Sequence, residues 1–152
     1  MSPVRADLSA LLEIEQEAMA ALNGLAGVGA APEARACLDE LHFAMRWFCS
    51  GLARHVRRPV KRAPPRFEPG VAAPIGDRLI AAPTGVDRIR LLTHTQRSVL
   101  VRVETVLAGS LAPELRAFLE QARAVLAQNV HCCEDAIASL DREREVRLDS
   151  GL

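Results

Sequence analysis

Residues 8–26 read LSALLEIEQEAMAALNGLA, and the spacing of their apolar residues decides the fold class. Apolar side chains recur every three or four positions, which is the period of an amphipathic helix. Glu15 lies on the same stripe. A carboxylate that faces a core needs a partner, such as a metal ion, a base or a proton, so Glu15 is the first candidate site residue. The apolar members of the stripe are Leu8, Leu11, Leu12, Met19, Leu22 and Ala26.

The composition predicts one globular domain, residues 1–152. Hydrophobic residues make up 49% of the chain and charged residues 25%, which is typical of globular proteins. The formal net charge is zero, so no global field attracts nucleic acid or a membrane surface. The first residues, MSPVRADL, lack the apolar segment of a secretory signal, and no apolar run is long enough to span a membrane. We therefore expect a cytoplasmic protein whose four cysteines are reduced thiols.

The helical period and the positions of proline and glycine predict four helices. Pro32 and Pro113 are each followed by glutamate, which is typical of the first turn of a helix. Gly109 is typical of a helix end, and Pro59 cannot continue one. The predicted helices cover residues 6–26, 32–57, 85–108 and 113–145. The prolines of residues 58–84 exclude a long regular element from that segment.

The two halves of the chain resemble each other. LLEIEQ at 11–16 aligns with LLTHTQ at 91–96, and PEARACLDE at 32–40 aligns with PELRAFLEQ at 113–121. The repeating unit is thus a pair of antiparallel helices, and two such hairpins can bury their stripes in one four-helix bundle. Residues 58–84 are long enough to run the length of the bundle. These features predict an all-α, ferritin-like bundle of two hairpins joined by a long crossover.

Residues equally distant from the turn of a hairpin lie at the same height, which predicts one mid-bundle layer of Glu15, Met45, Gln96 and Leu126. A ferritin-like di-metal site needs a glutamate from each of two helices and Glu-x-x-His from each of the other two. Met45 and Leu126 cannot supply those ligands. We therefore expect Glu15 to hydrogen-bond to Gln96 or to a trapped water, with no cofactor.

The alternative is an iron or manganese site that uses Glu15 with unexpected ligands. Two weak motifs, Asp39-x-x-His42 and His131-x-x-Glu134, lie away from the predicted layer and suit surface pairs better than ligands. The weak metal candidates are Glu15, Gln96, His42, His131 and Glu134.

Short pieces on all four predicted helices carry a resemblance to a known family. They are LLEIE at 11–15, Phe48-Cys49 with Leu52 and Arg54-His55, Leu91-Leu92 with Gln96 and Val99, and Asn129-Val130 with Cys133 and Ile137. On these pieces the chain resembles a bacterial family of ferritin-like proteins of unknown function, within the ferritin/rubrerythrin-like superfamily. The resemblance implies a ferritin-like fold. Relatives in that superfamily tend to carry acids or histidines where this chain has Met45 and Leu126, so the resemblance does not extend to metal binding or oxidase chemistry.

Three further features suggest contacts or chemistry. Cys49 and Cys133 lie on core stripes and are either small core residues or a redox pair. The basic run Arg54–Arg66 either balances charge within the protein or binds an acidic or phosphate ligand. Phe43 and Trp47, four residues apart, form an aromatic edge that predicts a homodimer or another protein contact.

The sequence contains no Ser-His-Asp pattern, no glycine-rich phosphate loop and no dinucleotide fingerprint. The leading hypothesis is therefore a non-enzymatic helical bundle, without a working di-metal centre, that acts through protein contacts. A metal-binding or oxidoreductase protein that uses Glu15, and a thiol-redox sensor that uses Cys49 and Cys133, are the two alternatives.

Overall fold

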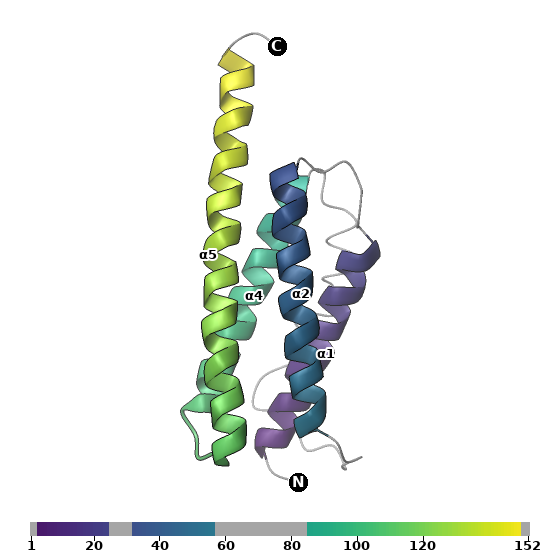
Figure 1. Ribbon diagram of the computed structural model, residues 1–152, viewed down its shortest axis with the longest axis vertical. Coiled ribbons are helices and arrows are strands. Elements are labelled where there is room, and N and C mark those ends of the chain that lie inside the picture. Colours follow the sequence, from purple (N-terminus) through teal and green to yellow (C-terminus); the bar gives the residue numbers. More distant parts are fainter. Residues whose placement is uncertain (1–2, 25–31, 57–84, 150–152) are drawn as a thin grey trace.

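The structure of the protein, a computed structural model, describes residues 3–24, 32–56 and 85–149. These residues form four helices and no strand (Figure 1). The all-α prediction is therefore confirmed. The predicted crossover, residues 58–84, lies outside the described residues. The helices are α1 (Pro3–Gly24), α2 (Pro32–His55), α4 (Gly85–Leu107) and α5 (Pro113–Asp149).

Two helix bounds differ from the prediction by more than two residues. Helix α1 begins at Pro3 rather than at residue 6, because proline at the first helical position loses no hydrogen bond that the helix needs. Helix α5 ends at Asp149 rather than at residue 145. Its final residues are charged, and Glu143 stands four positions before Arg147, a spacing that supports a solvated helix.

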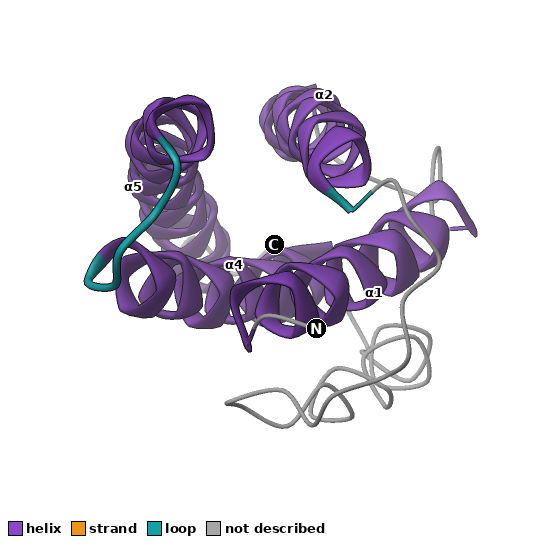
Figure 2. Cartoon of the chain, turned by 90° about the horizontal axis from the view of Figure 1, so that it is seen from below, coloured by secondary structure: helices purple, strands orange, loops and turns teal. Residues whose placement is uncertain are grey.

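The helices surround one core in the cyclic order α1, α2, α5, α4 (Figure 2). The α4–α5 pair has the most extensive contact, followed by α1–α2 and then α2–α5. The contact between α1 and α4 closes the ring and is smaller. Helix α5 therefore connects the two hairpins mainly through its packing against α2.

Pairwise contacts fix the helix directions. Phe118, near the start of α5, stacks on His55 at the end of α2, and Cys133 further along α5 touches Cys37 near the start of α2. Helix α5 is therefore antiparallel to α2. It is also antiparallel to α4, because Arg90 and Arg97 of α4 pair with Asp141 and Glu134 of α5 respectively. It follows that α2 and α4 are parallel, so α2 ends at one end of the bundle and α4 begins at the other (Figure 1).

The buried face of α1 is rotated relative to the predicted stripe. Ile14 and Ala18 are fully buried, whereas Leu12 and Met19 are only partly buried. Helix α1 contacts both α2 and α4, so its buried face is wider than a single stripe and is shifted toward Ile14 and Ala18. Most of the core elsewhere follows the predicted stripes, and its largest fully buried apolar side chains are Phe48, Leu8, Leu11, Leu41, Met45, Leu52, Ile89, Leu92, Leu119 and Leu126.

Three polar residues of the segment LLTHTQ, namely Thr93, Thr95 and Gln96, are buried, although the partner segment in the repeat is more apolar. Thr93 and Thr95 are both buried, and their hydroxyls donate to the carbonyl oxygens of Ile89 and Leu91, at 2.7 and 3.0 Å. A threonine that donates to the carbonyl four residues back needs no other partner. This local bonding lets α4 place hydroxyl groups in the core at little cost.

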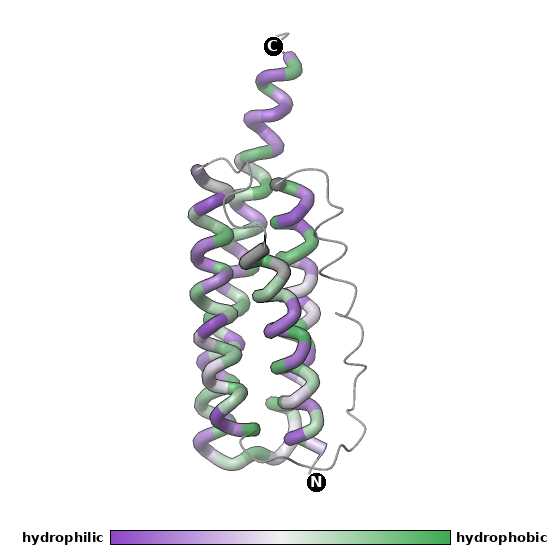
Figure 3. Tube along the Cα trace, turned by 90° about the vertical axis from the view of Figure 1, so that its right-hand side faces the viewer, coloured by the Kyte–Doolittle hydropathy of each residue, from purple (hydrophilic) through white to green (hydrophobic). Residues whose placement is uncertain are grey.

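The last turns of α5 extend beyond the other three helices and are mostly hydrophilic (Figure 3). Val146 and Leu148 are the exceptions there, with exposed fractions of 66% and 68%. Within the described ranges, no helix combines the length and apolar character that a membrane span requires.

Candidate functional site

The predicted mid-bundle layer is the first candidate site. Glu15, Met45, Gln96 and Leu126 come from four different helices, and each has at most 1% of its surface exposed. Gln96 Nε2 donates a hydrogen bond of 2.8 Å to Glu15 Oε1. Glu15 and Gln96 therefore lie together across the α1–α4 contact, which is one of the two partnerships that the sequence predicts for Glu15.

Burial dominates the electrostatics of Glu15. It raises the pKa of the Glu15 carboxyl from 4.5 to about 7, although the hydrogen bond from Gln96 favours the charged form. The second oxygen, Oε2, is buried and has no hydrogen-bond partner among the described residues. Cys49 lies within the field of Glu15, and the pKa of its thiol is raised to about 12, first by burial and then by the Glu15 charge. The layer can therefore hold one proton on Glu15 near neutral pH.

The structure does not bring the weak metal candidates together. His42 is half-buried on α2, with Nε2 unpartnered in the described part of the chain. His131 is exposed and lies 3.6 Å from Asp135, and Glu134 pairs with Arg97 at 2.5 Å. No group of three or more histidine, cysteine, aspartate or glutamate side chains with metal-binding geometry occurs within the described residues. Gln96, which hydrogen-bonds to Glu15, supplies an amide, and the other two residues of the predicted layer, Met45 and Leu126, carry a thioether and an aliphatic side chain.

A thiol pair is the second candidate site, and it differs from the pair predicted from sequence. The sulfur beside Cys133 is that of Cys37, at 2.8 Å, and both side chains are buried. Cys49 instead lies near Glu15, and Cys132 is exposed. Sequence reasoning missed Cys37, although its position four residues before Leu41 places it on the core stripe of α2.

The pKa values of the two thiols of the pair are shifted in opposite directions. The hydrogen bond between them lowers the pKa of Cys37 and raises that of Cys133, and either thiol can be its donor. Burial adds to the increase at Cys133 and opposes the decrease at Cys37. The lower pKa favours the thiolate at Cys37 over the thiolate at Cys133.

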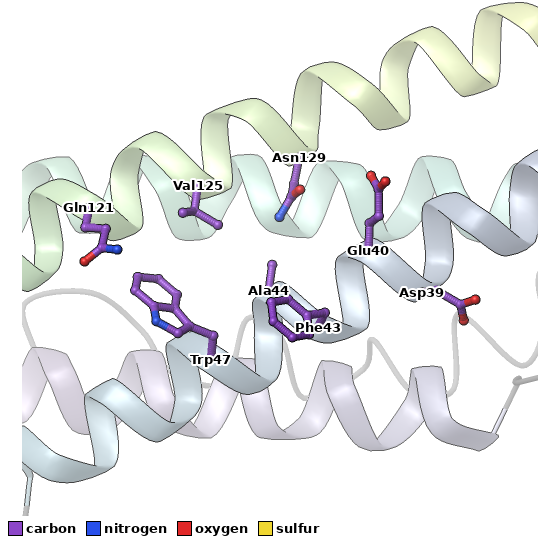
Figure 4. A pocket seen from close by; sticks show the side chains of 8 residues that line it. All are labelled: Asp39, Glu40, Phe43, Ala44, Trp47, Gln121, Val125 and Asn129. Carbon is purple, nitrogen blue, oxygen red and sulfur yellow. The ribbon is translucent and has the colours of Figure 1, made fainter.

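A groove between α2 and α5 is the third candidate site (Figure 4). Its volume is about 510 Å³. Phe43 has 75% of its surface exposed, and Trp47 is half-buried against Phe118 with ring centroids 5.4 Å apart. Glu40 points toward α5, whereas Asp39 points away from it (Figure 4). The groove is lined by Asp39, Glu40, Phe43, Ala44 and Trp47 of α2, and by Gln121, Val125 and Asn129 of α5.

The sequence predicted only half of this groove. The four-residue spacing of Phe43 and Trp47 identified the α2 edge, but nothing in the sequence identified the α5 side, because it forms only when the two hairpins pack. The predicted basic run Arg54–Arg66 is described only as far as residue 56. Arg54 is exposed there and the His55 ring packs on Phe118, and the rest of the run lies outside the described residues.

Comparison with known proteins adds no assignment to these three sites. Neither the family models, the curated proteins nor the solved structures gave a match to this chain.

Proposed function

We propose that the protein is a non-catalytic, ferritin-like helical bundle that acts through protein contacts, and that its partner is a second copy of the chain. The observation that carries this proposal is the groove between α2 and α5, where Phe43 is 75% exposed beside half-buried Trp47. An exposed aromatic side chain in an apolar groove is typical of a contact surface.

The end of α5 has the complementary chemistry. Val146 and Leu148 are exposed there among charged side chains of both signs, in which Arg142 and Arg144 alternate with Glu143 and Glu145. The groove combines aromatic rings with the carboxylates of Asp39 and Glu40. Apolar side chains flanked by arginine suit such a groove, because arginine can pair with carboxylates and stack on aromatic rings. Each copy carries both surfaces, so two copies can exchange their α5 ends in a symmetric contact.

The helix directions support a ferritin-like arrangement. Helices α1 and α5 run one way, and α2 and α4 run the other way (Figure 1). A chain with these directions needs a long connection between α2 and α4, and residues 58–84 have the necessary length. The mid-bundle layer supports the non-catalytic part of the proposal, since Met45 and Leu126 stand where the superfamily carries ligands.

Light scattering coupled to gel filtration tests the proposed contact. We expect the full-length protein to elute as a dimer at micromolar concentration. F43E places a charge in the groove, and a V146E/L148E double variant places two charges on the α5 end. Each variant should raise the dimer dissociation constant at least about tenfold, which corresponds to a loss of roughly 1.4 kcal/mol.

V101E is the matched control, because Val101 has 60% of its surface exposed on α4 and lines neither surface. It should leave the dimer unchanged. A monomer at high concentration would contradict the proposal. A dimer that F43E disrupts and V146E/L148E leaves intact would contradict the proposed role of the α5 end.

A further inference from the structure

We propose that Cys37 and Cys133 are a modification site, at which hydrogen peroxide oxidises the two thiols to a reversible intramolecular disulfide that joins α2 to α5. The site goes beyond the proposed contact function, since no groove residue takes part in it. It rests on a long-range pair of buried sulfurs, 96 positions apart in the sequence and 2.8 Å apart in space.

The geometry favours a bond between these two sulfurs over the other cysteine pairs. A disulfide bond length of about 2.05 Å requires the sulfurs of Cys37 and Cys133 to approach by less than about 1 Å. Cys132 is exposed and points away from Cys133 on the same helix, since adjacent helical residues diverge by about 100°. Cys49 is buried beside Glu15, where its raised pKa keeps it a neutral thiol.

The environment gives the two sulfurs different roles. Cys37 is 7% exposed and Cys133 2% exposed, so Cys37 is the more accessible of the two buried sulfurs. The hydrogen bond between the two thiols lowers the pKa of Cys37 and so favours its thiolate. Cys37 is therefore the attacking sulfur, and Cys133 is the resolving one.

The reaction consumes one peroxide and two thiols. The Cys37 thiolate attacks one peroxide oxygen and breaks the O–O bond, which leaves a sulfenic acid and releases hydroxide that takes up a proton to form water. The sulfur of Cys133 then attacks the Cys37 sulfur. The S–S bond forms, the S–O bond breaks, and a second water leaves with the proton of the Cys133 thiol. The two thiols are oxidised by two electrons, and the peroxide is reduced to two waters.

The bond would link the two hairpins where they meet. Cys37 belongs to the α1–α2 hairpin and Cys133 to the α4–α5 hairpin, and the α2–α5 contact is the main connection between the hairpins. A disulfide that closes so long a loop restricts the unfolded chain strongly. We therefore expect the oxidised protein to melt roughly 10 °C above the reduced protein.

Thiol counting under denaturing conditions tests the proposal on the full chain. The reduced protein should titrate four thiols. After mild hydrogen peroxide it should lose two thiols and the mass of two hydrogens, remain monomeric on a non-reducing gel, and regain all its thiols with dithiothreitol. Peptide mapping should recover Cys37 linked to Cys133, and this readout does not depend on any variant.

Single serine variants locate the bond. C37S and C133S should keep all their remaining thiols, whereas C132S and C49S should still lose two. Circular dichroism of each reduced variant verifies that it is folded. Retention of four thiols in the wild-type protein would overturn the proposal, as would a C37S variant that still loses two thiols or a mapped bond that involves Cys132.

Discussion

Replacement of Glu15 by glutamine should stabilise the protein at alkaline pH by about 3 kcal/mol. Glu15 is fully buried, and its pKa in the folded protein is about 7, against 4.5 for an ordinary glutamate. A difference of about 2.5 in pKa corresponds to roughly 3 kcal/mol of differential stability. Glutamine keeps the shape and can still accept the hydrogen bond from Gln96, but it never carries a charge.

The pKa shift of Glu15 is upward, so the stability that it contributes is complete below pH 4.5, where both the folded and the unfolded chain hold the proton. Between pH 4.5 and about 7 the unfolded chain loses the proton while the folded chain keeps it, so stability falls as pH rises. Above that window both states are ionised and the loss is complete. The wild-type protein and E15Q should therefore have similar stability near pH 4.5 and should diverge as pH rises to about 7.

Urea unfolding at about pH 5 and about pH 8 measures this effect, since titratable groups that do not interact with Glu15 contribute equally to both proteins and cancel in the comparison. E104Q is the matched control, because Glu104 is an exposed glutamate on α4. It should keep the wild-type pH dependence. If E15Q loses stability between the two pH values as steeply as the wild-type protein, the buried carboxyl is not the cause.

An added methyl group should have its largest effect on the stability of the protein at Gly51. A Cβ atom at Gly51 would lie 2.1 Å from Cε1 and 2.2 Å from Cζ of the Phe118 ring. Phe118 is held against Trp47, Phe48 and His55, with ring centroids 5.4 to 6.0 Å away, so the ring cannot move without disturbing α2. We expect G51A to destabilise the protein by about 2 kcal/mol through overpacking.

The sign of this effect should reverse when Phe118 is removed. In an F118A background the added methyl group has space, and alanine in a helix interior is about 1 kcal/mol more favourable than glycine. A double-mutant cycle of G51A and F118A, measured by urea unfolding, should therefore give a coupling energy of about 3 kcal/mol. G109A is the control, because a Cβ at Gly109 would approach nothing closer than 3.4 Å. Additive effects of the two substitutions would contradict the close approach of α2 and α5 at this point.

Much of the fold follows from local patterns that the chain carries by itself. Pro32 and Pro113 mark the starts of α2 and α5, as the sequence predicts. The height argument also selected the four residues of the mid-bundle layer, and the structure buries all of them. The Glu15–Gln96 hydrogen bond agrees with the predicted level of these two residues, which occupy corresponding positions of the two hairpins.

Contacts between the two hairpins could not be predicted from such local patterns. The sequence suggested Cys49 as the redox partner of Cys133, because both lie on core stripes. A stripe shows that a residue faces the core, but it does not show at what height a residue of α2 meets α5. Only the packed structure places Cys37 against Cys133 and Cys49 near Glu15. The α5 side of the groove was missed for the same reason.

The sequence by itself determined that this protein is helical, where α2, α4 and α5 begin, and that Glu15 faces the core. These properties depend on helical period, proline and glycine, which act over a few residues. The tertiary structure alone decided which thiols touch and where an apolar groove opens. Those outcomes depend on the rotation and register of one hairpin against the other. Side-chain packing between residues far apart in the chain sets that rotation and register.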